Sequence, residues 1–257
     1  MSIVKSQNEL EIRRKHFEKG FVLSDISLLS VMFTTTEEFI RNVLPKPLEV
    51  GDLLSASAYI AEFKGSSFCP PYNEAAIFIS AKFDDESGYH CLSMPVTNDI
   101  AMLGGREIYG YPKKMAEKIE ITREGNRISG TCIRRGVPII SIVGELATPL
   151  EEQIRPEPHF LVKSIADELG LSMSPKPLLV RQQSEILENG TTIIGDGEVS
   201  FGKSIHDPFH EIPVTQVFMI SYTEGMTLRM PPGKILAELD AKEYTPHSLI
   251  KYDWDLN

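Results

Sequence analysis

The stretch AEKIEITREGNRISGTCIRRGVPIISIVGEL, residues 116–146, decides the fold class. It contains three runs rich in β-branched residues, namely Ala116–Thr122, Arg127–Arg134 and Pro138–Leu146. Short segments with a glycine, residues 124–126 and 136–138, separate these runs. Glycine in so short a connection is typical of a hairpin turn, because it adopts backbone conformations that other residues avoid. The stretch therefore predicts three consecutive antiparallel strands.

Strand-like runs continue on both sides of this stretch. Those bounded by turn residues are Leu53–Phe63, Ala75–Phe83, His90–Val96, Thr191–Phe201, Val214–Met230 and Ile235–Leu239. So many strands with few helical patterns predict a mainly β protein with a few short helices. Because exposed strand edges invite aggregation, we expect a predominantly antiparallel sheet that is closed or sandwiched.

Two segments have helical features. In residues 34–44, Thr35 and Glu38 have the spacing of a capping box, and Pro45 follows as a helix terminator. In residues 161–169, leucine and isoleucine recur at helical spacing, and Gly170 suits a helix C-terminus. The first pattern predicts a short helix, and the second on its own favours a helix too.

Length and composition favour a single domain. The chain has 257 residues, of which 42% are hydrophobic, and no internal repeat or Gly/Ser-rich linker divides it. We therefore expect one domain over residues 1–257, with residues 1–25 as an N-terminal extension.

The charge balance excludes some classes of partner. With 26 basic and 36 acidic residues, the formal charge of −10 repels a nucleic-acid backbone. No apolar run approaches the roughly 18 residues of a membrane span, and the first 19 residues are too charged for a signal-peptide core. These features predict a cytoplasmic protein that binds neither nucleic acid nor membrane.

The sequence contains no convincing metal or cofactor motif. Its three cysteines are far apart and form no Cys-x-x-Cys pair, which argues against a disulfide framework and a zinc site. His206 and His210 have metal-like spacing, but Pro208 between them opposes the helix that would put both on one face. Because a phosphate-binding glycine loop is also missing, we expect activity without metal or nucleotide.

The segment GGREIYGYPKK, residues 104–114, carries the most specific chemical signal. It resembles the signature of the acetoacetate decarboxylase family, in which an Arg-Glu pair precedes a Tyr-Pro-Lys-Lys turn whose first lysine forms an imine with substrate. Further ordered matches are residues 44–49, Tyr72-x-Glu74, and His206-Asp207-Pro208 leading to Ile212-Pro213-Val214. The resemblance covers roughly residues 30–240.

The resemblance implies a cofactor-free lyase that acts on a small keto acid. It also implies a closed antiparallel β-cone or barrel, a homo-oligomer, and an extended conformation for Phe160–Ile165 in place of the helix. The imine-forming lysine would be Lys113. Only a neutral amine attacks a ketone, whereas an ordinary lysine is almost wholly protonated at pH 7. Burial in an apolar pocket or a neighbouring cation can favour the neutral amine, and acetoacetate decarboxylase is itself a known example of such a lysine.

The neighbouring cation would be Lys114. Adjacent residues of an extended chain point to opposite sides, however, so we rank burial above the charge of Lys114. The alternative is an ordinary solvated Lys-Lys turn.

The remaining candidates are supporting groups. Glu74 is expected to act as an acid/base or electrostatic group beside the imine, the alternative being a solvated carboxylate at a strand end. Arg106 and Glu107 follow a Gly-Gly turn and are expected to organise the loop. Tyr72 and Tyr109 either present hydroxyl groups to the pocket or pack in the core.

Two positions depart from the family pattern. Threading from the turn at residues 45–49 puts Ile26 where the decarboxylases carry a carboxylate-contacting arginine, and Tyr59 where they carry a second acid. An arginine fork is the usual way to orient a carboxylate, so slow turnover of acetoacetate is expected.

Three functions are therefore compatible with the sequence. The first is decarboxylation of a β-keto acid through a Lys113 imine. The second is Schiff-base aldolase, dehydratase or hydratase chemistry on 2-oxo acids, as in relatives of the wider superfamily. The third, from another class, is a non-catalytic β-barrel that binds a small molecule.

Overall fold

The computed structural model describes residues 3–151, 155–170, 172–173, 176–248 and 251–252. Its helices are α1 (Gln7–Phe17), α2 (Glu37–Val43), α3 (Asp99–Gly104), the π-helix η1 (Gly105–Tyr109), the 3-10 helix η2 (Phe209–Glu211) and α4 (Ala241–Ser248). Its strands are β1 (Phe21–Thr34), β2 (Glu49–Val50), β3 (Ser55–Ser66), β4 (Tyr72–Phe83), β5 (Glu86–Val96), β6 (Lys113–Met115), β7 (Lys118–Glu124), β8 (Arg127–Arg134), β9 (Val137–Leu150), β10 (His159–Lys163), β11 (Leu178–Gln182), β12 (Glu185–Glu188), β13 (Thr191–Ser200), β14 (Gln216–Met230) and β15 (Lys234–Glu238).

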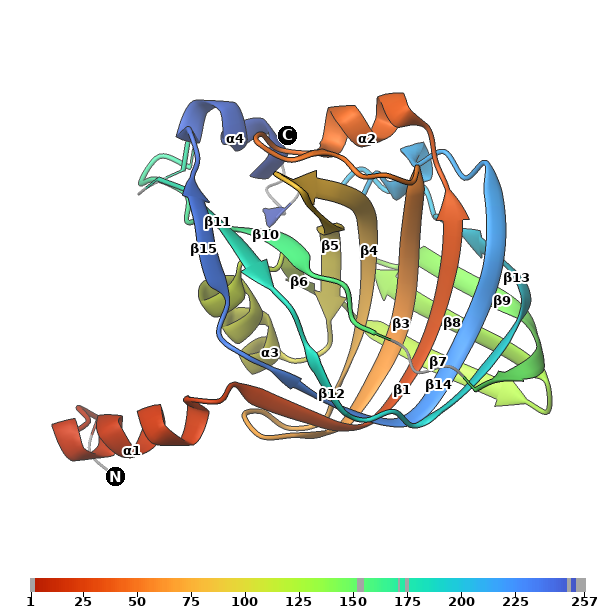
Figure 1. Cartoon of the computed structure of the whole chain (residues 1–257), viewed down its shortest axis with the longest axis horizontal. Coiled ribbons are helices and arrows are strands. Elements are labelled where there is room, and N and C mark those ends of the chain that lie inside the picture. Colours follow the sequence, from red (N-terminus) through yellow and green to blue (C-terminus); the bar gives the residue numbers. More distant parts are fainter. Residues whose placement is uncertain (1–2, 152–154, 171, 174–175, 249–250, 253–257) are drawn as a thin grey trace.

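All described strands join one sheet of 15 strands, and this confirms the mainly β prediction (Figure 1). The main path runs β15-β11-β10-β5-β4-β3-β1-β14-β13-β9-β8-β7, while β2, β6 and β12 pair at its sides. Most pairs are antiparallel, but β5 pairs in parallel with both β6 and β10. The sheet is therefore mixed and not purely antiparallel. The recorded pairings form a path with β15 and β7 at its ends, so closure into a cone or barrel stays a prediction.

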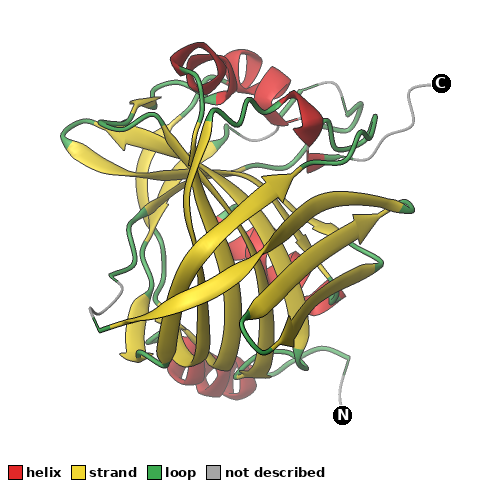
Figure 2. Ribbon diagram, turned by 90° about the vertical axis from the view of Figure 1, so that its right-hand side faces the viewer, coloured by secondary structure: helices red, strands yellow, loops and turns green. Residues whose placement is uncertain are grey.

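The sheet folds over on itself around an apolar core. Strand β7 packs across β3 and β4, and Figure 2 shows the strands crossing in two layers. Two hydrogen bonds join these layers: Asn73 Nδ2 donates to the Ile119 carbonyl oxygen at 2.6 Å, and the Ile121 amide donates to Glu62 Oε1 at 3.3 Å. Buried aliphatic side chains from both layers, including Ile60, fill the space between them.

The three strands predicted from residues 116–146 are present. Strand β8 has the predicted bounds, Arg127–Arg134, and pairs antiparallel with β7 and β9. Gly125 and Gly136 occupy the turns with φ of 63° and 73°, in the left-handed region that favours glycine. The turn chemistry therefore sets these hairpins as expected.

The predicted first helix is present as α2, but its capping residue was predicted wrongly. Thr36, and not Thr35, is the N-cap, and its hydroxyl accepts a hydrogen bond from the Phe39 amide at 3.2 Å. Thr35 is buried, and its amide pairs with the Leu54 carbonyl oxygen at 3.0 Å. Tertiary pairing thus holds Thr35 in extended structure and moves the helix start by one residue.

Sequence analysis did not predict two elements near the N-terminus, α1 and β1. α1 is exposed along its length and projects from the sheet in Figure 1. β1 begins at Phe21, so residues 21–25 of the predicted extension belong to the sheet. β1 has a bulge at Asp25, where φ is 48°. Because of this extra residue, the buried Leu23 and Ile26 are three positions apart and not two, which obscures the alternation typical of a strand.

The segment around residues 160–169, for which the helical spacing and the family resemblance disagreed, begins as the strand β10. His159–Lys163 pairs with β11 and with β5, so the extended prediction is confirmed there and the helical one is wrong. Backbone pairing on both sides of β10 outweighs the helical spacing of Leu161, Ile165 and Leu169. None of the described helices has the length and apolar composition that a membrane crossing requires.

Candidate active site

Lys113 opens β6, the short strand that follows η1. Gly110 ends η1 with φ of 94°, and β6 then pairs in parallel with β5 so that Lys113 lies beside Met94. The Lys113 side chain passes over Gly105, where an added Cβ would lie 2.4 Å from Lys113 Cε. The glycine that precedes the Arg-Glu pair therefore makes room for the lysine stem.

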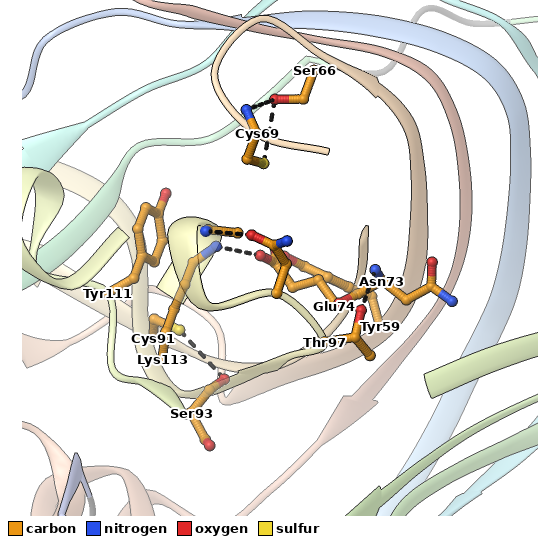
Figure 3. A network of polar contacts seen from close by, with 12 residues as sticks. Tyr59, Ser66, Cys69, Asn73, Glu74, Cys91, Ser93, Thr97, Tyr111 and Lys113 are labelled. Carbon is orange, nitrogen blue, oxygen red and sulfur yellow. Dashed lines mark hydrogen bonds and ion pairs between the residues drawn. The ribbon is translucent and has the colours of Figure 1, made fainter. Parts of the chain in front are cut away.

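The amine of Lys113 forms an ion pair with Glu74, and the Tyr59 hydroxyl donates a hydrogen bond to the other oxygen of the same carboxylate (Figure 3). Lys113 and Glu74 are only 5% and 4% exposed. A charge pair with so little exposure depends mainly on its own partners, because burial removes most of its hydration. Glu74 is thus held between an amine and a phenol.

The register of β3 and β4 brings Tyr59 and Glu74 together. Tyr59 lies opposite Ala76, so Glu74 is its diagonal neighbour, two residues along on the same face of the sheet. Tyr59 is one of the two residues that depart from the family pattern, and Glu74 is predicted to be catalytic. Sequence analysis did not anticipate that they touch.

Burial keeps the surrounding phenols neutral. Burial, and to a lesser degree the charge of Glu74, raises the pKa of the Tyr59 hydroxyl well above its usual value. The same two causes raise the pKa values of Tyr72 and Tyr111. The Lys113 amine lies 5.4 Å from the ring centroid of Tyr72 and 5.9 Å from that of Tyr111. The aromatic faces and phenols around Lys113 are therefore polarisable but uncharged.

Sequence analysis missed Tyr111 and His159 as site residues. The Tyr111 hydroxyl lies 3.0 Å from Gln182 Oε1 and 2.8 Å from His159 Nδ1, and both rings border the Lys113 cavity. Burial lowers the pKa of His159 to about 4, so this imidazole is neutral at pH 7. Tyr111 lies within the quoted motif, directly before Pro112, and that position was the signal available.

The Lys113 and Glu74 side chains open into a cavity of about 190 Å³. Its lining comes from β1, β3, β4, β5, β6, β10, β12 and β14, and from segments near Tyr111, Pro156 and Ser184. The apolar part of the lining includes Leu23, Ile26, Leu28, Phe63, Met226 and Leu228. Ile26, the residue threaded onto an arginine position, is 1% exposed and forms part of this wall.

Lys114 lies on the other side of β6 from Lys113. Its amine pairs with the buried Asp207, which also accepts a hydrogen bond from Arg134 Nε at 2.8 Å. The amine also donates to the His206 carbonyl oxygen at 3.3 Å. The family-like His206-Asp207-Pro208 segment therefore contacts Lys114 and not Lys113.

The other predicted residues surround the loop of Lys113. Arg106 Nη1 donates to the Lys113 carbonyl oxygen at 3.3 Å, and its guanidinium lies 5.3 Å from the ring centroid of Tyr252. Glu107 is exposed on η1. The Tyr109 hydroxyl donates to the Met230 carbonyl oxygen at 2.9 Å, which ties η1 to the end of β14. These contacts place Arg106 and Tyr109 as structural supports.

Tyr72 borders the cavity with one face of its ring. The ring of Phe63 is stacked on the Tyr72 ring at a centroid distance of 4.8 Å. Tyr72 therefore packs in an apolar cluster and also faces Lys113.

The histidines with metal-like spacing lie outside the Lys113 cavity. The His206 carbonyl oxygen accepts a hydrogen bond from Lys114, and His210 is exposed in η2. Across the described part of the chain, His, Cys, Asp and Glu side chains form no group of three or more arranged to hold a metal ion.

Comparison with known proteins finds both a matching family model and related sequences. The family model for acetoacetate decarboxylase matches residues 12–239. Acetoacetate decarboxylase 3 of Mesorhizobium japonicum is 33% identical over 107 residues, a match that covers 42% of this chain and 41% of that relative.

Solved structures share the fold at low sequence identity. The crystal structure of acetoacetate decarboxylase from Legionella pneumophila superposes with a TM-score of 0.74 at 19% identity, covering 85% of this chain and 88% of that one. The enduracididine biosynthesis enzyme MppR complexed with pyruvate superposes with a TM-score of 0.70 at 17% identity, covering 85% and 91%. The fold thus occurs both in an acetoacetate decarboxylase and in a biosynthesis enzyme whose structure contains pyruvate.

Proposed function

Because this chain belongs to the acetoacetate decarboxylase family, we propose that it is a lyase in which Lys113 forms an imine with a small carbonyl substrate. One observation carries the proposal: the buried Lys113 amine contacts the Glu74 carboxylate at the wall of an apolar cavity. An amine, a proton acceptor beside it and space for a substrate are the parts that imine formation needs.

The contact between Lys113 and Glu74 provides a route to the neutral amine. Glu74 accepts a proton from the ammonium group, and the freed amine attacks the substrate carbonyl carbon. The carbonyl oxygen then leaves as water, with one proton from the amine nitrogen and one that Glu74 returns. The product is a protonated imine, with a carbon–nitrogen double bond to Lys113.

The protonated imine accepts the electrons of the bond that breaks next. In our leading reaction, a β-keto acid loses CO₂, and the electron pair of the broken carbon–carbon bond forms an enamine. Glu74, which is a carboxylate after imine formation, takes up a proton from water. Hydrogen-bonded to the neutral Tyr59 phenol, it then delivers this proton to the enamine carbon and so forms a new imine. Water then hydrolyses this imine and releases a ketone and Lys113.

A second reaction shares the imine and differs in the bond that changes. Aldolase, dehydratase or hydratase chemistry on a 2-oxo acid is supported by a neighbour of the same fold, MppR, whose complex contains pyruvate. The apolar Ile26 wall also favours a substrate other than acetoacetate, since an arginine would otherwise orient a carboxylate there.

Covalent trapping tests the proposal against a non-catalytic binding protein. The protein is incubated with a small ketone or oxo acid and sodium borohydride, and the labelled peptide is identified by mass. We expect a reduced adduct on Lys113, and none in Lys113→Met or in Lys113→Arg, which keeps a cation but forms no imine. Binding without any adduct would favour the non-catalytic function.

The expected setting of the enzyme belongs to the same proposal. We expect a homo-oligomer in the cytoplasm that works without added metal or nucleotide. Light scattering of the purified protein would test the oligomer, and exhaustive chelation followed by the trapping assay would test the metal requirement.

A further inference from the structure

We infer that the substrate carries, on one side of its carbonyl group, an uncharged hydrocarbon arm that packs against the wall formed by β1 and β14. The inference rests on the proposed imine at Lys113 and names the substrate class for that site. It holds whether CO₂ or another group leaves.

The wall is built by two paired strands. β1 contributes Leu23, Ile26 and Leu28, and β14 contributes Met226, Leu228 and Met230. The register joins Leu23 to Leu228 and Ile26 to Met226, so the apolar side chains form one continuous surface. Leu23, Ile26 and Met226 are 2%, 1% and 6% exposed. Such a surface gains free energy when it covers hydrocarbon.

The charges of the cavity do not suit an anionic arm. Among the described residues that line it, Lys113 and Glu74 carry charge, and they already contact each other. Tyr59 remains a neutral phenol and His159 a neutral imidazole. A carboxylate against Ile26 would lose its hydration and meet no arginine and no second lysine among the described lining residues. The protonated imine of Lys113 is a cation, but Glu74 already pairs with this nitrogen.

The wall also suits arms of different shape. Met94, Met226 and Met230 all line the cavity, and methionine side chains adapt to irregular hydrocarbon because they are unbranched and flexible. The cavity volume of about 190 Å³ suits a small molecule. We therefore expect a small carbonyl compound and not a large conjugate.

A matched pair of ligands tests the inference. 4-Oxopentanoate and 5-methyl-2-hexanone have the same heavy-atom shape, but the first ends in a carboxylate and the second in an isopropyl group. Calorimetry measures the Kd of each with the native protein, and borohydride trapping measures the concentration that half-labels Lys113. We expect the ketone to bind and label at a concentration at least about tenfold lower, equivalent to about 1.4 kcal/mol. Equal or tighter binding of 4-oxopentanoate would overturn the inference, as would binding of neither ligand at millimolar concentration.

The two measurements separate this inference from the proposed function. Tighter binding of the ketone without any Lys113 adduct would leave the apolar arm supported and the imine rejected. Adducts with both ligands at the same concentration would support the imine and reject the apolar arm.

Substitution of the wall provides a second test. Ile26→Arg adds a cation where the wall is apolar and should reduce or reverse the preference for the ketone. Ile26→Leu is the matched control, because it keeps an apolar side chain of the same volume and should retain the preference. Thermal unfolding of both variants shows whether the fold persists. An unchanged preference in a folded Ile26→Arg protein would argue that the arm lies elsewhere.

Discussion

Lys113 and Lys114 are consecutive residues of β6, yet their amines lie in two separate buried ion pairs, with Glu74 and with Asp207. The alternation of side chains along a strand sends the two lysines to opposite sides. Asp207 also binds Arg134, so Lys114 belongs to a cluster of charges separate from the Lys113–Glu74 pair. The charge of Lys114 is therefore not directed at the Lys113 amine.

Lys114→Met should therefore weaken the fold and leave the nucleophile in place. The substitution removes one of the two cations that contact the buried Asp207, and loss of one member of a buried pair costs about 3 kcal/mol. Urea unfolding should show this loss, while borohydride trapping still labels Lys113. A stable Lys114→Met protein that no longer forms the adduct would contradict the separation of the two lysines.

The two neighbouring glycines should respond differently to alanine. In Gly105→Ala, the new Cβ would lie 2.4 Å from Lys113 Cε, so the lysine stem must move and imine formation should fall at least about tenfold. In Gly104→Ala, the nearest atom is 3.9 Å away on Phe68, and φ is already helical at −59°.

Gly104→Ala is thus the matched control. It should preserve trapping and stabilise the protein by about 0.4–1 kcal/mol, because alanine has fewer unfolded conformations. Equal trapping rates in the two variants would show that the Lys113 stem is not held against Gly105.

Tyr59→Phe should impair proton transfer while it preserves the cavity. The phenol donates a hydrogen bond to Glu74, whereas phenylalanine fills the same space without that hydrogen bond. We expect imine formation to slow across the pH–rate profile. Glu74→Gln should have the larger effect and slow the step by about 10²–10⁴-fold, as is typical for removal of an acid/base group. A Tyr59→Phe profile that overlays the native one would exclude a role for the phenol.

His90 should make the fold sensitive to acid. Burial lowers the pKa of His90 in the folded protein from 6.5 to about 4. Between these values the unfolded chain binds a proton that the folded chain does not, so the free energy of unfolding falls as pH drops from 6.5 towards 4. The full difference corresponds to about 3 kcal/mol.

His90→Asn should flatten this part of the stability curve. Asparagine can still donate to the Phe160 carbonyl oxygen, which His90 Nδ1 reaches at 2.8 Å, but it does not titrate. Urea unfolding at a series of pH values gives the comparison. A native and a variant protein with parallel stability curves between pH 6.5 and 4 would show that His90 does not contribute.

Local sequence determined the elements that depend on neighbouring residues. The β8 strand and its two glycine turns follow from alternation and from the need for positive φ at Gly125 and Gly136. The motif around Lys113 also identified the candidate nucleophile, through its resemblance to the signature of the acetoacetate decarboxylase family. These features depend on interactions between residues close in sequence.

Tertiary structure decided the features that join distant segments. The parallel pairing of β5 with β6 and β10 leaves no trace in the residues of a single strand. The start of α2 moved to Thr36 because the Thr35 amide pairs with Leu54. In both cases, backbone hydrogen bonds to another segment outweighed the local preference.

The same division applies to the site. The sequence contains Lys113, Glu74, Tyr59 and Ile26, but the strand register decides that Tyr59 touches Glu74, and the pairing of β1 with β14 puts Ile26 in the cavity wall. Lys114 and Asp207 are 93 residues apart and meet only because the chain folds. Sequence fixes which groups are available. Their burial and mutual contacts, which govern whether an amine can react, arise from packing between segments that no local pattern specifies.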